Sequence, residues 1–162
     1  MNTVYYHGTN KIFDEFKIPL VSENIKSPLG LLGIYFTRCP KLASDFTKVS
    51  WTNENSKYKK GAQVIPVYLN FKNPLILSAE TFLMLSGRGD KYSNGYREKC
   101  IQEGYDSIIF EKPKIEDPFY NEIISEFPTE QVVIFNNSNI KNIYHNLTTN
   151  LCFDNSIYKM GL

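Results

Sequence analysis

The sequence has little cysteine, no long hydrophobic run and almost no excess of charge of either sign. Its three cysteines, Cys39, Cys100 and Cys152, lie far apart and provide neither a disulfide framework nor the spacing of a metal-binding motif. We expect three free thiols, a reducing compartment and no bound metal. The 18 basic and 17 acidic residues leave a net charge of +1, which favours neither a nucleic acid nor a membrane surface as the partner.

The longest apolar stretch, residues 28–36, contains two glycines. It is far shorter than the roughly 20 residues that a membrane helix needs. No basic segment followed by a hydrophobic stretch comes after Met1, so we expect no secretory signal. We expect a monomeric, cytoplasmic protein, in a target or infected host cell if it is delivered there. The 162 residues suit one domain, 1–162, with a peripheral tail after about residue 146.

Short runs of β-branched and aromatic residues, separated by Gly, Pro and Asn, predict an α+β domain with mainly antiparallel pairing. The expected strands are residues 3–6, 33–37, 64–71, 75–77, 106–110 and 132–135. The expected helices are residues 40–49, 79–85 and 96–103. Residues 7–10, with the sequence HGTN, predict a turn, and residues 19–32, 51–61, 87–90 and 111–129 predict loops or turns.

Three segments each place one reactive side chain at the edge of a predicted strand. They are HGT with His7, GIYFT with Tyr35 and EQVVIF with Glu130. A further aromatic residue, Phe46, follows Tyr35 by eleven positions. In this order the segments resemble the motifs of the His-Tyr-Glu branch of the ADP-ribosyltransferases, the branch of diphtheria toxin and the poly(ADP-ribose) polymerases.

The resemblance extends over about residues 4–144, nearly the whole chain. Residues 64–77 and 104–110, with the sequences VIPVYLNFKNPLIL and GYDSIIF, are similar to the small ADP-ribosyltransferase domains of phage polyvalent proteins. The resemblance implies mainly antiparallel, split β-sheets with a few flanking helices around an NAD cleft. It also implies that NAD⁺ serves as co-substrate.

Cleavage of the nicotinamide–ribose bond builds positive charge on the ribose, so the reaction needs a negative group nearby. A carboxylate about 4 Å away contributes roughly 4 kcal/mol at an effective dielectric near 20, or nearly three decades of rate. The resemblance assigns this role to Glu130, which would also accept a hydrogen bond from the 2′-hydroxyl of the nicotinamide ribose. Glu130, His7 and Tyr35 are therefore the expected catalytic residues.

The resemblance also implies how the donor is held. His7 would bond the ribose hydroxyls of the adenosine half, and the backbone of Gly8 would approach the carboxamide closely. Tyr35 and Phe46 would provide flat aromatic walls for the nicotinamide. The polymerases carry a serine in place of Ala43 and a tyrosine in place of Phe46, so we expect transfer of a single ADP-ribose. The remaining residues of the expected donor site are Thr9 and Phe36.

Acceptor choice in this family belongs largely to the loop before the catalytic glutamate, here residues 111–129. Pro128 stands two positions before Glu130, where arginine-modifying members commonly carry Glu or Gln. We therefore expect an acceptor group other than arginine, which leaves an acidic side chain, an amide, a hydroxyl or a nucleic-acid base. A protein acceptor is preferred over a nucleic acid because the net charge is close to zero. The candidates for contact with the acceptor are Phe119, Tyr120, Asn121, Glu122 and Glu126.

Each candidate also has a structural interpretation. His7 is equally typical of a turn, Tyr35 and Phe46 of a core, and Glu130 of a strand start. Glu122 and Glu126 are rivals for the catalytic carboxylate, and Glu130 is preferred because the longer apolar strand follows it.

Three functions stay open. The first is a mono-ADP-ribosyltransferase acting as a toxin, phage protein or effector, and the second is an NAD⁺ glycohydrolase. The third is a non-catalytic module that binds a nucleotide or a partner.

Overall fold

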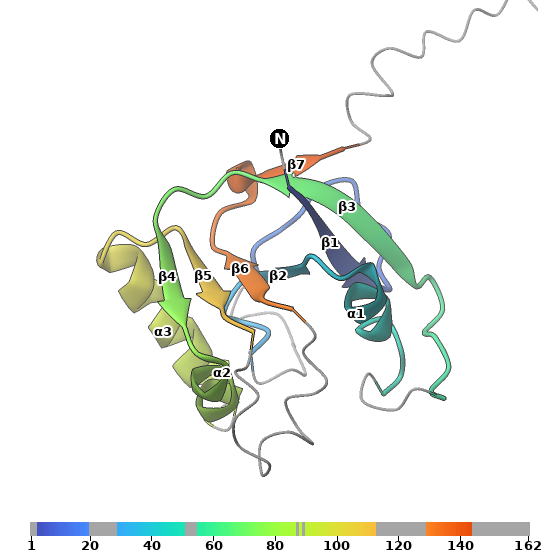
Figure 1. Cartoon of the computed structure of the whole chain (residues 1–162), viewed down its shortest axis with the longest axis horizontal. Helices are drawn as coiled ribbons and strands as arrows, with labels where there is room; N and C mark the ends of the chain where they lie inside the picture. The colour runs from blue at the N-terminus through green and yellow to red at the C-terminus, as the bar shows by residue number, and fades with distance from the viewer. Residues whose placement is uncertain are drawn as a thin grey trace, which may run out of the picture.

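The computed structural model describes residues 3–19, 29–50, 55–86, 88, 90–112 and 129–143. The elements follow along the chain in the order β1 (Val4–Thr9), β2 (Ile34–Thr37), α1 (Pro40–Asp45), β3 (Gln63–Leu69), β4 (Pro74–Leu77), α2 (Ala79–Ser86), α3 (Asp90–Gln102), β5 (Ser107–Phe110), β6 (Gln131–Ile134), the 3-10 helix η1 (Asn137–Asn139) and β7 (Ile140–Asn142) (Figure 1).

In the described part of the chain the strands form one seven-stranded sheet in the order β4-β5-β6-β2-β1-β3-β7. β4 and β5 are parallel, and every other neighbouring pair is antiparallel. This mixed sheet with few helices fits the expected α+β class. Figure 1 shows α2 and α3 beside the β4–β5 end of the sheet and α1 beside β1.

The sheet is weakest between β1 and β2. β1 pairs with β3 along its whole length, from Val4 to Thr9, but with β2 only through the pair Tyr6–Thr37. The turn expected at residues 7–10 is wrong, because His7 and Gly8 continue the strand opposite β3. Pairing with a β-branched neighbour strand outweighs the local turn preference of these residues.

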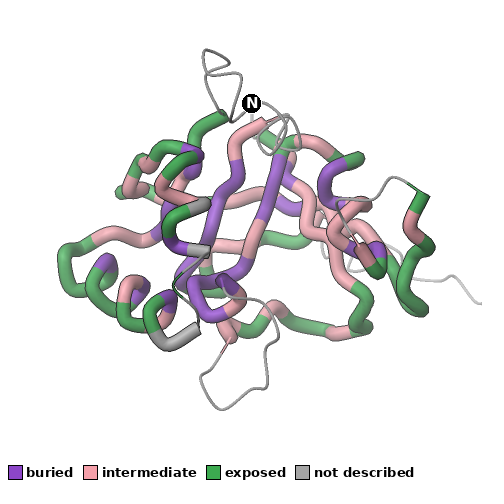
Figure 2. The backbone as a smooth tube through the Cα atoms, turned by 90° about the horizontal axis from the view of Figure 1, so that it is seen from below, coloured by how far each residue is buried: buried purple, intermediate pink, exposed green. Residues whose placement is uncertain are grey.

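Alternating side chains divide the sheet into two faces with separate cores. On the face that we call the helix face, Val133 packs in one cluster with Leu85 of α2 and Cys100 of α3. On the other, which we call the loop face, Val132 and Ile134 pack with Phe16, from the segment after β1. The central strands are therefore buried along most of their length (Figure 2).

The remaining differences from expectation lie at element ends. α1 ends at Asp45, so Phe46 is its C-cap residue and does not lie on the helix. α3 begins at Asp90, earlier than expected, and Gly104 follows its end with a φ of +89°. The short β7 and η1 were not expected. Among the described residues no helix combines the length and apolarity needed to cross a membrane.

Two glycines of the α3 region provide a matched pair of stability tests. Gly95 lies within the exposed face of the helix with open space around its Cβ position, so Gly95→Ala is expected to stabilise the fold by about 0.5–1 kcal/mol. Gly104 has a positive φ that alanine rarely adopts, so Gly104→Ala is expected to destabilise it by about 1 kcal/mol. Urea unfolding of the two variants measures both effects. Equal changes of the same sign in the free energy of unfolding of the two variants would contradict the positive φ of Gly104.

Candidate active site

The strand order brings the three motif residues onto neighbouring strands. His7 lies on β1, Tyr35 lies on β2, and Glu130 directly precedes β6. β2 is hydrogen-bonded to both other strands, so His7 and Glu130, more than 120 positions apart in sequence, are separated in the sheet only by this strand. The sequence motifs therefore converge in space, although their side chains do not all share one face.

His7 bridges the gap that opens where β1 and β2 stop pairing. Its Nδ1 lies 2.8 Å from the backbone carbonyl oxygen of Tyr35. A carbonyl only accepts hydrogen bonds, so the proton sits on Nδ1 and the neutral ring keeps Nε2 as an acceptor. Burial lowers the pKa of His7 below its ordinary value of 6.5, against the smaller opposing effect of that hydrogen bond. A neutral ring with an accepting Nε2 suits a hydroxyl donor such as a ribose.

The ring of His7 lies within a group of phenylalanines on the loop face. Ring centroids of Phe16 and Phe36 are 5.3 and 5.5 Å from it, and that of Phe13 is 6.4 Å away. Phe36 is only 2% exposed, so its ring is part of the hydrophobic core and does not offer an exposed surface to NAD⁺. The contacts with Phe13 and Phe16 are edge-on and that with Phe36 is tilted, and together they fix the orientation of the imidazole.

Tyr35 points to the opposite, helix face of the sheet. Its hydroxyl donates to the carbonyl of Leu29 at 3.2 Å, and its ring meets Phe82 edge-on at 6.5 Å. Burial raises the pKa of the phenol above its ordinary value. In this structure the side chain of Tyr35 behaves as a core tyrosine, while its backbone carbonyl contacts His7.

Gly8 is required by the close approach of α1. A Cβ built on Gly8 would lie 1.7 Å from the carbonyl oxygen of Ala43, a buried residue of the helix. The absence of a side chain thus serves helix–strand packing, whatever further role the Gly8 backbone has toward a donor. Thr9 ends β1, and its hydroxyl accepts from the backbone N–H of Lys11 at 3.1 Å.

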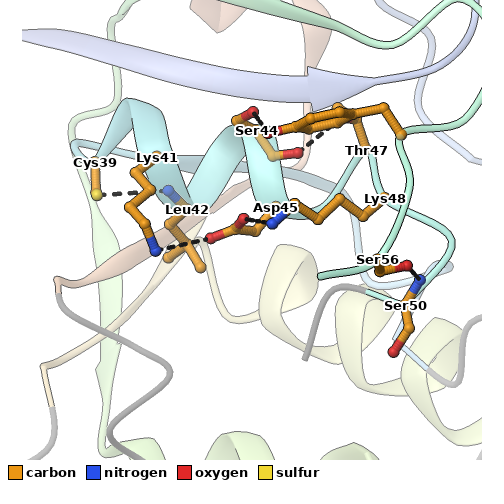
Figure 3. Close-up of polar contacts among 10 residues, drawn as sticks. Cys39, Lys41, Leu42, Ser44, Asp45, Thr47, Lys48, Ser50 and Ser56 are labelled. Carbon is orange, nitrogen blue, oxygen red and sulfur yellow. Dashed lines mark hydrogen bonds and ion pairs between the residues drawn. The ribbon is translucent and has the colours of Figure 1, made fainter. Parts of the chain in front are cut away.

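Local polar contacts stabilise the two ends of α1 (Figure 3). The Sγ of Cys39 accepts from the backbone N–H of Leu42 at 3.5 Å at the start of the helix. At its end Lys48 contacts Asp45 at 2.7 Å, and Thr47 donates to the carbonyl of Ser44 at 2.7 Å. These contacts fix the helix that presents Ala43 to Gly8. Phe46, at the C-cap, is half-buried.

Glu130 forms an ion pair that the sequence motifs do not include. Its Oε1 lies 2.7 Å from the Nε of Arg38, and the two side chains are 24% and 53% exposed. The Arg38 guanidinium lies over the ring of Tyr5, 5.6 Å from its centroid. Because Tyr5 belongs to the loop-face core, Glu130 shares that face with His7. Arg38 could have been noticed as the residue that an antiparallel register places opposite Glu130.

Several sequence candidates lie outside the described residues. Glu122 and Glu126, the rivals of Glu130, are among them, so the choice between the three carboxylates stays a prediction. The other acceptor candidates outside the described residues are Phe119, Tyr120 and Asn121.

A cavity of about 470 Å³ lies where β5 begins and β6 ends, away from Glu130 at the start of β6. Asp106 and Asn136 line it, and each already accepts hydrogen bonds from nearby backbone N–H groups. The lining thus has a structural role and contains none of the motif residues. Within the described ranges, no three His, Cys, Asp or Glu side chains gather in a way that could hold a metal ion.

The sequence profile of the family described as "ADP-Ribosyltransferase in polyvalent proteins" matches residues 1–150. No curated protein and no solved structure matches the chain.

The contact between Gly8 and α1 predicts a large effect of one added methyl group. Gly8→Ala would place Cβ against the Ala43 carbonyl, so strand and helix must separate, at an expected cost of about 1–3 kcal/mol. Thermal and urea unfolding measure the loss, with Gly95→Ala as the control for an unobstructed glycine. A Gly8→Ala protein of wild-type stability would contradict this packing.

The low pKa of His7 predicts a pH dependence of stability. The folded-state pKa lies below the unfolded value, so the unfolded chain binds more protons between the two. Stability contributed by His7 is therefore complete above about pH 6.5 and is lost as the pH falls below it. Urea unfolding of wild type and His7→Asn between about pH 5 and 7.5 measures this dependence. The free energy of unfolding of the wild type minus that of His7→Asn should fall as the pH falls below about 6.5.

His7→Asn keeps an N–H donor for the Tyr35 carbonyl and does not titrate in this range. The other histidine of the sequence, His145, is present in both proteins and cancels in the difference. A difference that does not change with pH would contradict the buried neutral imidazole.

Proposed function

The chain belongs to the family of ADP-ribosyltransferases found in polyvalent proteins, and we propose on this premise that it is a mono-ADP-ribosyltransferase with NAD⁺ as donor. The proposed acceptor is a macromolecule, most simply a protein. The proposed setting is the cytoplasm of a target or infected cell, where a toxin, phage protein or effector would act. The observation that carries the proposal is the convergence of the three motifs on neighbouring strands, within β1 and β2 and directly before β6.

The donor-binding part of the proposal rests on His7 and the chain around it. Neutral His7 offers Nε2 as an acceptor for a ribose hydroxyl, and its ring is held by the Tyr35 carbonyl and three phenylalanines. Gly8 follows His7 on β1, beyond the last residue that pairs with β2, and the space of its missing side chain is taken by Ala43 of α1. Positioning of this kind lowers the entropic part of the barrier.

The catalytic part of the proposal rests on Glu130. Loss of nicotinamide leaves positive charge on the ribose, and a fixed carboxylate stabilises that charge most where water is partly excluded. The Glu130 side chain is 24% exposed, which leaves it accessible while its surroundings stay partly dry. Its contact with Arg38 uses Oε1, so the second carboxylate oxygen is available to a donor hydroxyl.

Tyr35 and Phe46 carry a weaker part of the proposal. Tyr35 is buried against Phe82 on the helix face, so it would support the donor site from behind through its backbone. Phe46 is half-buried at the C-cap of the helix that approaches Gly8, and the proposal gives it the role of a nicotinamide wall.

The test is incubation of the purified protein with labelled NAD⁺, with and without cell lysate. Glu130→Gln keeps the shape of the side chain and removes its charge, so release of nicotinamide is expected to fall by about 10²–10³-fold. Glu103→Gln, which removes one exposed carboxylate paired with Lys99, is the matched control and should retain activity. Labelled macromolecule that disappears in Glu130→Gln alone supports the transferase.

Nicotinamide release without a labelled macromolecule would favour the glycohydrolase alternative. Equal activity of Glu130→Gln and wild type would remove Glu130 from the proposal and turn attention to Glu122. Neither turnover nor NAD⁺ binding by the wild type would contradict the enzymatic function and favour the non-catalytic module.

A further inference from the structure

Arg38 is held on two sides at the end of β2. Its Nε contacts Glu130 at 2.7 Å, and its Nη2 donates to the hydroxyl of Tyr5 at 3.4 Å. The guanidinium also lies over the Tyr5 ring, 5.6 Å from its centroid. Tyr5 is 5% exposed and part of the loop-face core, so it gives the arginine a rigid support.

The backbone next to Glu130 is fixed from the same strand. The hydroxyls of Thr37 and Thr129 are 3.0 Å apart, and Thr129 donates to the carbonyl of Glu130 at 3.0 Å. Thr37 in turn accepts from the backbone N–H of Cys39 at 3.1 Å. Thr37 thus orders the main chain around Glu130, while Arg38, the next residue, orders its carboxylate.

We propose that Arg38 is a positioning residue for Glu130, holding one carboxylate oxygen so that the other faces the donor ribose. The inference rests on the proposed function and adds a residue that the three motifs do not contain. Arg38 acts through Glu130 in this account and does not itself touch the reacting atoms.

Two effects of Arg38 oppose each other, and their sizes differ. Its positive charge disfavours the positive charge that develops on the ribose, but the side chain is 53% exposed and water and salt screen that effect. Orientation of the carboxylate is a short-range effect that screening does not reduce, and a small displacement of a catalytic group costs about 10²-fold in rate. Removal of Arg38 should therefore slow the reaction.

The experiment measures nicotinamide release under steady-state conditions for wild type, Arg38→Gln and Arg38→Lys. Arg38→Gln is expected to lower kcat by roughly 10- to 100-fold with a much smaller change in KM for NAD⁺. Arg38→Lys keeps a cation within reach of Glu130 and should recover much of the loss. Lys99→Gln removes a cation that is 68% exposed, against 53% for Arg38, from an ion pair with Glu103, and should match wild type.

A double-mutant cycle separates positioning from other roles. Glu130→Asp draws the carboxylate back from Arg38 but keeps its charge, so Arg38→Gln should cost far less in that background than in wild type. Thermal unfolding checks that Arg38→Gln stays folded, as expected for an exposed ion pair.

The outcomes distinguish the two proposals. Unchanged or faster turnover by Arg38→Gln, a loss confined to KM, or an equal loss in the Glu130→Asp background would each overturn the positioning role while wild-type activity upholds the proposed function. Absence of NAD⁺ cleavage by the wild type would overturn the proposed function and the positioning role together.

Discussion

The junction between β1 and β2 is the constraint on which the candidate site depends. The strands pair once, at Tyr6 and Thr37, and then separate, although both belong to one sheet. A side-chain contact, His7 Nδ1 to the Tyr35 carbonyl, takes over where the ladder ends. Beyond it, Gly8 admits α1 to the helix face. The end of the ladder leaves the Tyr35 carbonyl to the imidazole, which fixes the ring and keeps its second nitrogen as an acceptor.

The parts of the fold that sequence predicts well are those with local signals. β2 and β6 are short β-branched runs between breakers, and α3 ends at a glycine that needs a positive φ. Residues 7–9 were predicted wrongly because HGT favours a turn locally, while its strand partners lie more than 50 positions away on β3. β7, at Ile140–Asn142, has no periodic pattern of its own and exists through pairing with β3.

For the site, sequence could identify residue types but not the directions of their side chains. The alternation of side chains along a strand assigns each residue to a face of the sheet only when the strand and its register are known. Because a turn was expected at His7, the sequence did not predict the face on which this side chain lies. The structure places His7 and Glu130 on the loop face and the Tyr35 side chain on the helix face. It also adds Arg38, which follows a motif residue directly but becomes a partner of Glu130 only through the antiparallel pairing of β2 with β6.

The proposal assigns bond cleavage and acceptor choice to different parts of the chain. The groups proposed for cleavage, His7, Glu130 and Arg38, lie on or beside strands whose central residues are buried. The acceptor candidates lie in residues 119–126, outside that framework in sequence. A transferase and a glycohydrolase would therefore share the same strands and differ only in what reaches the ribose after nicotinamide leaves. The convergence of β1, β2 and β6 supports the cleavage chemistry common to both functions, so the acceptor has to be identified through its labelled product.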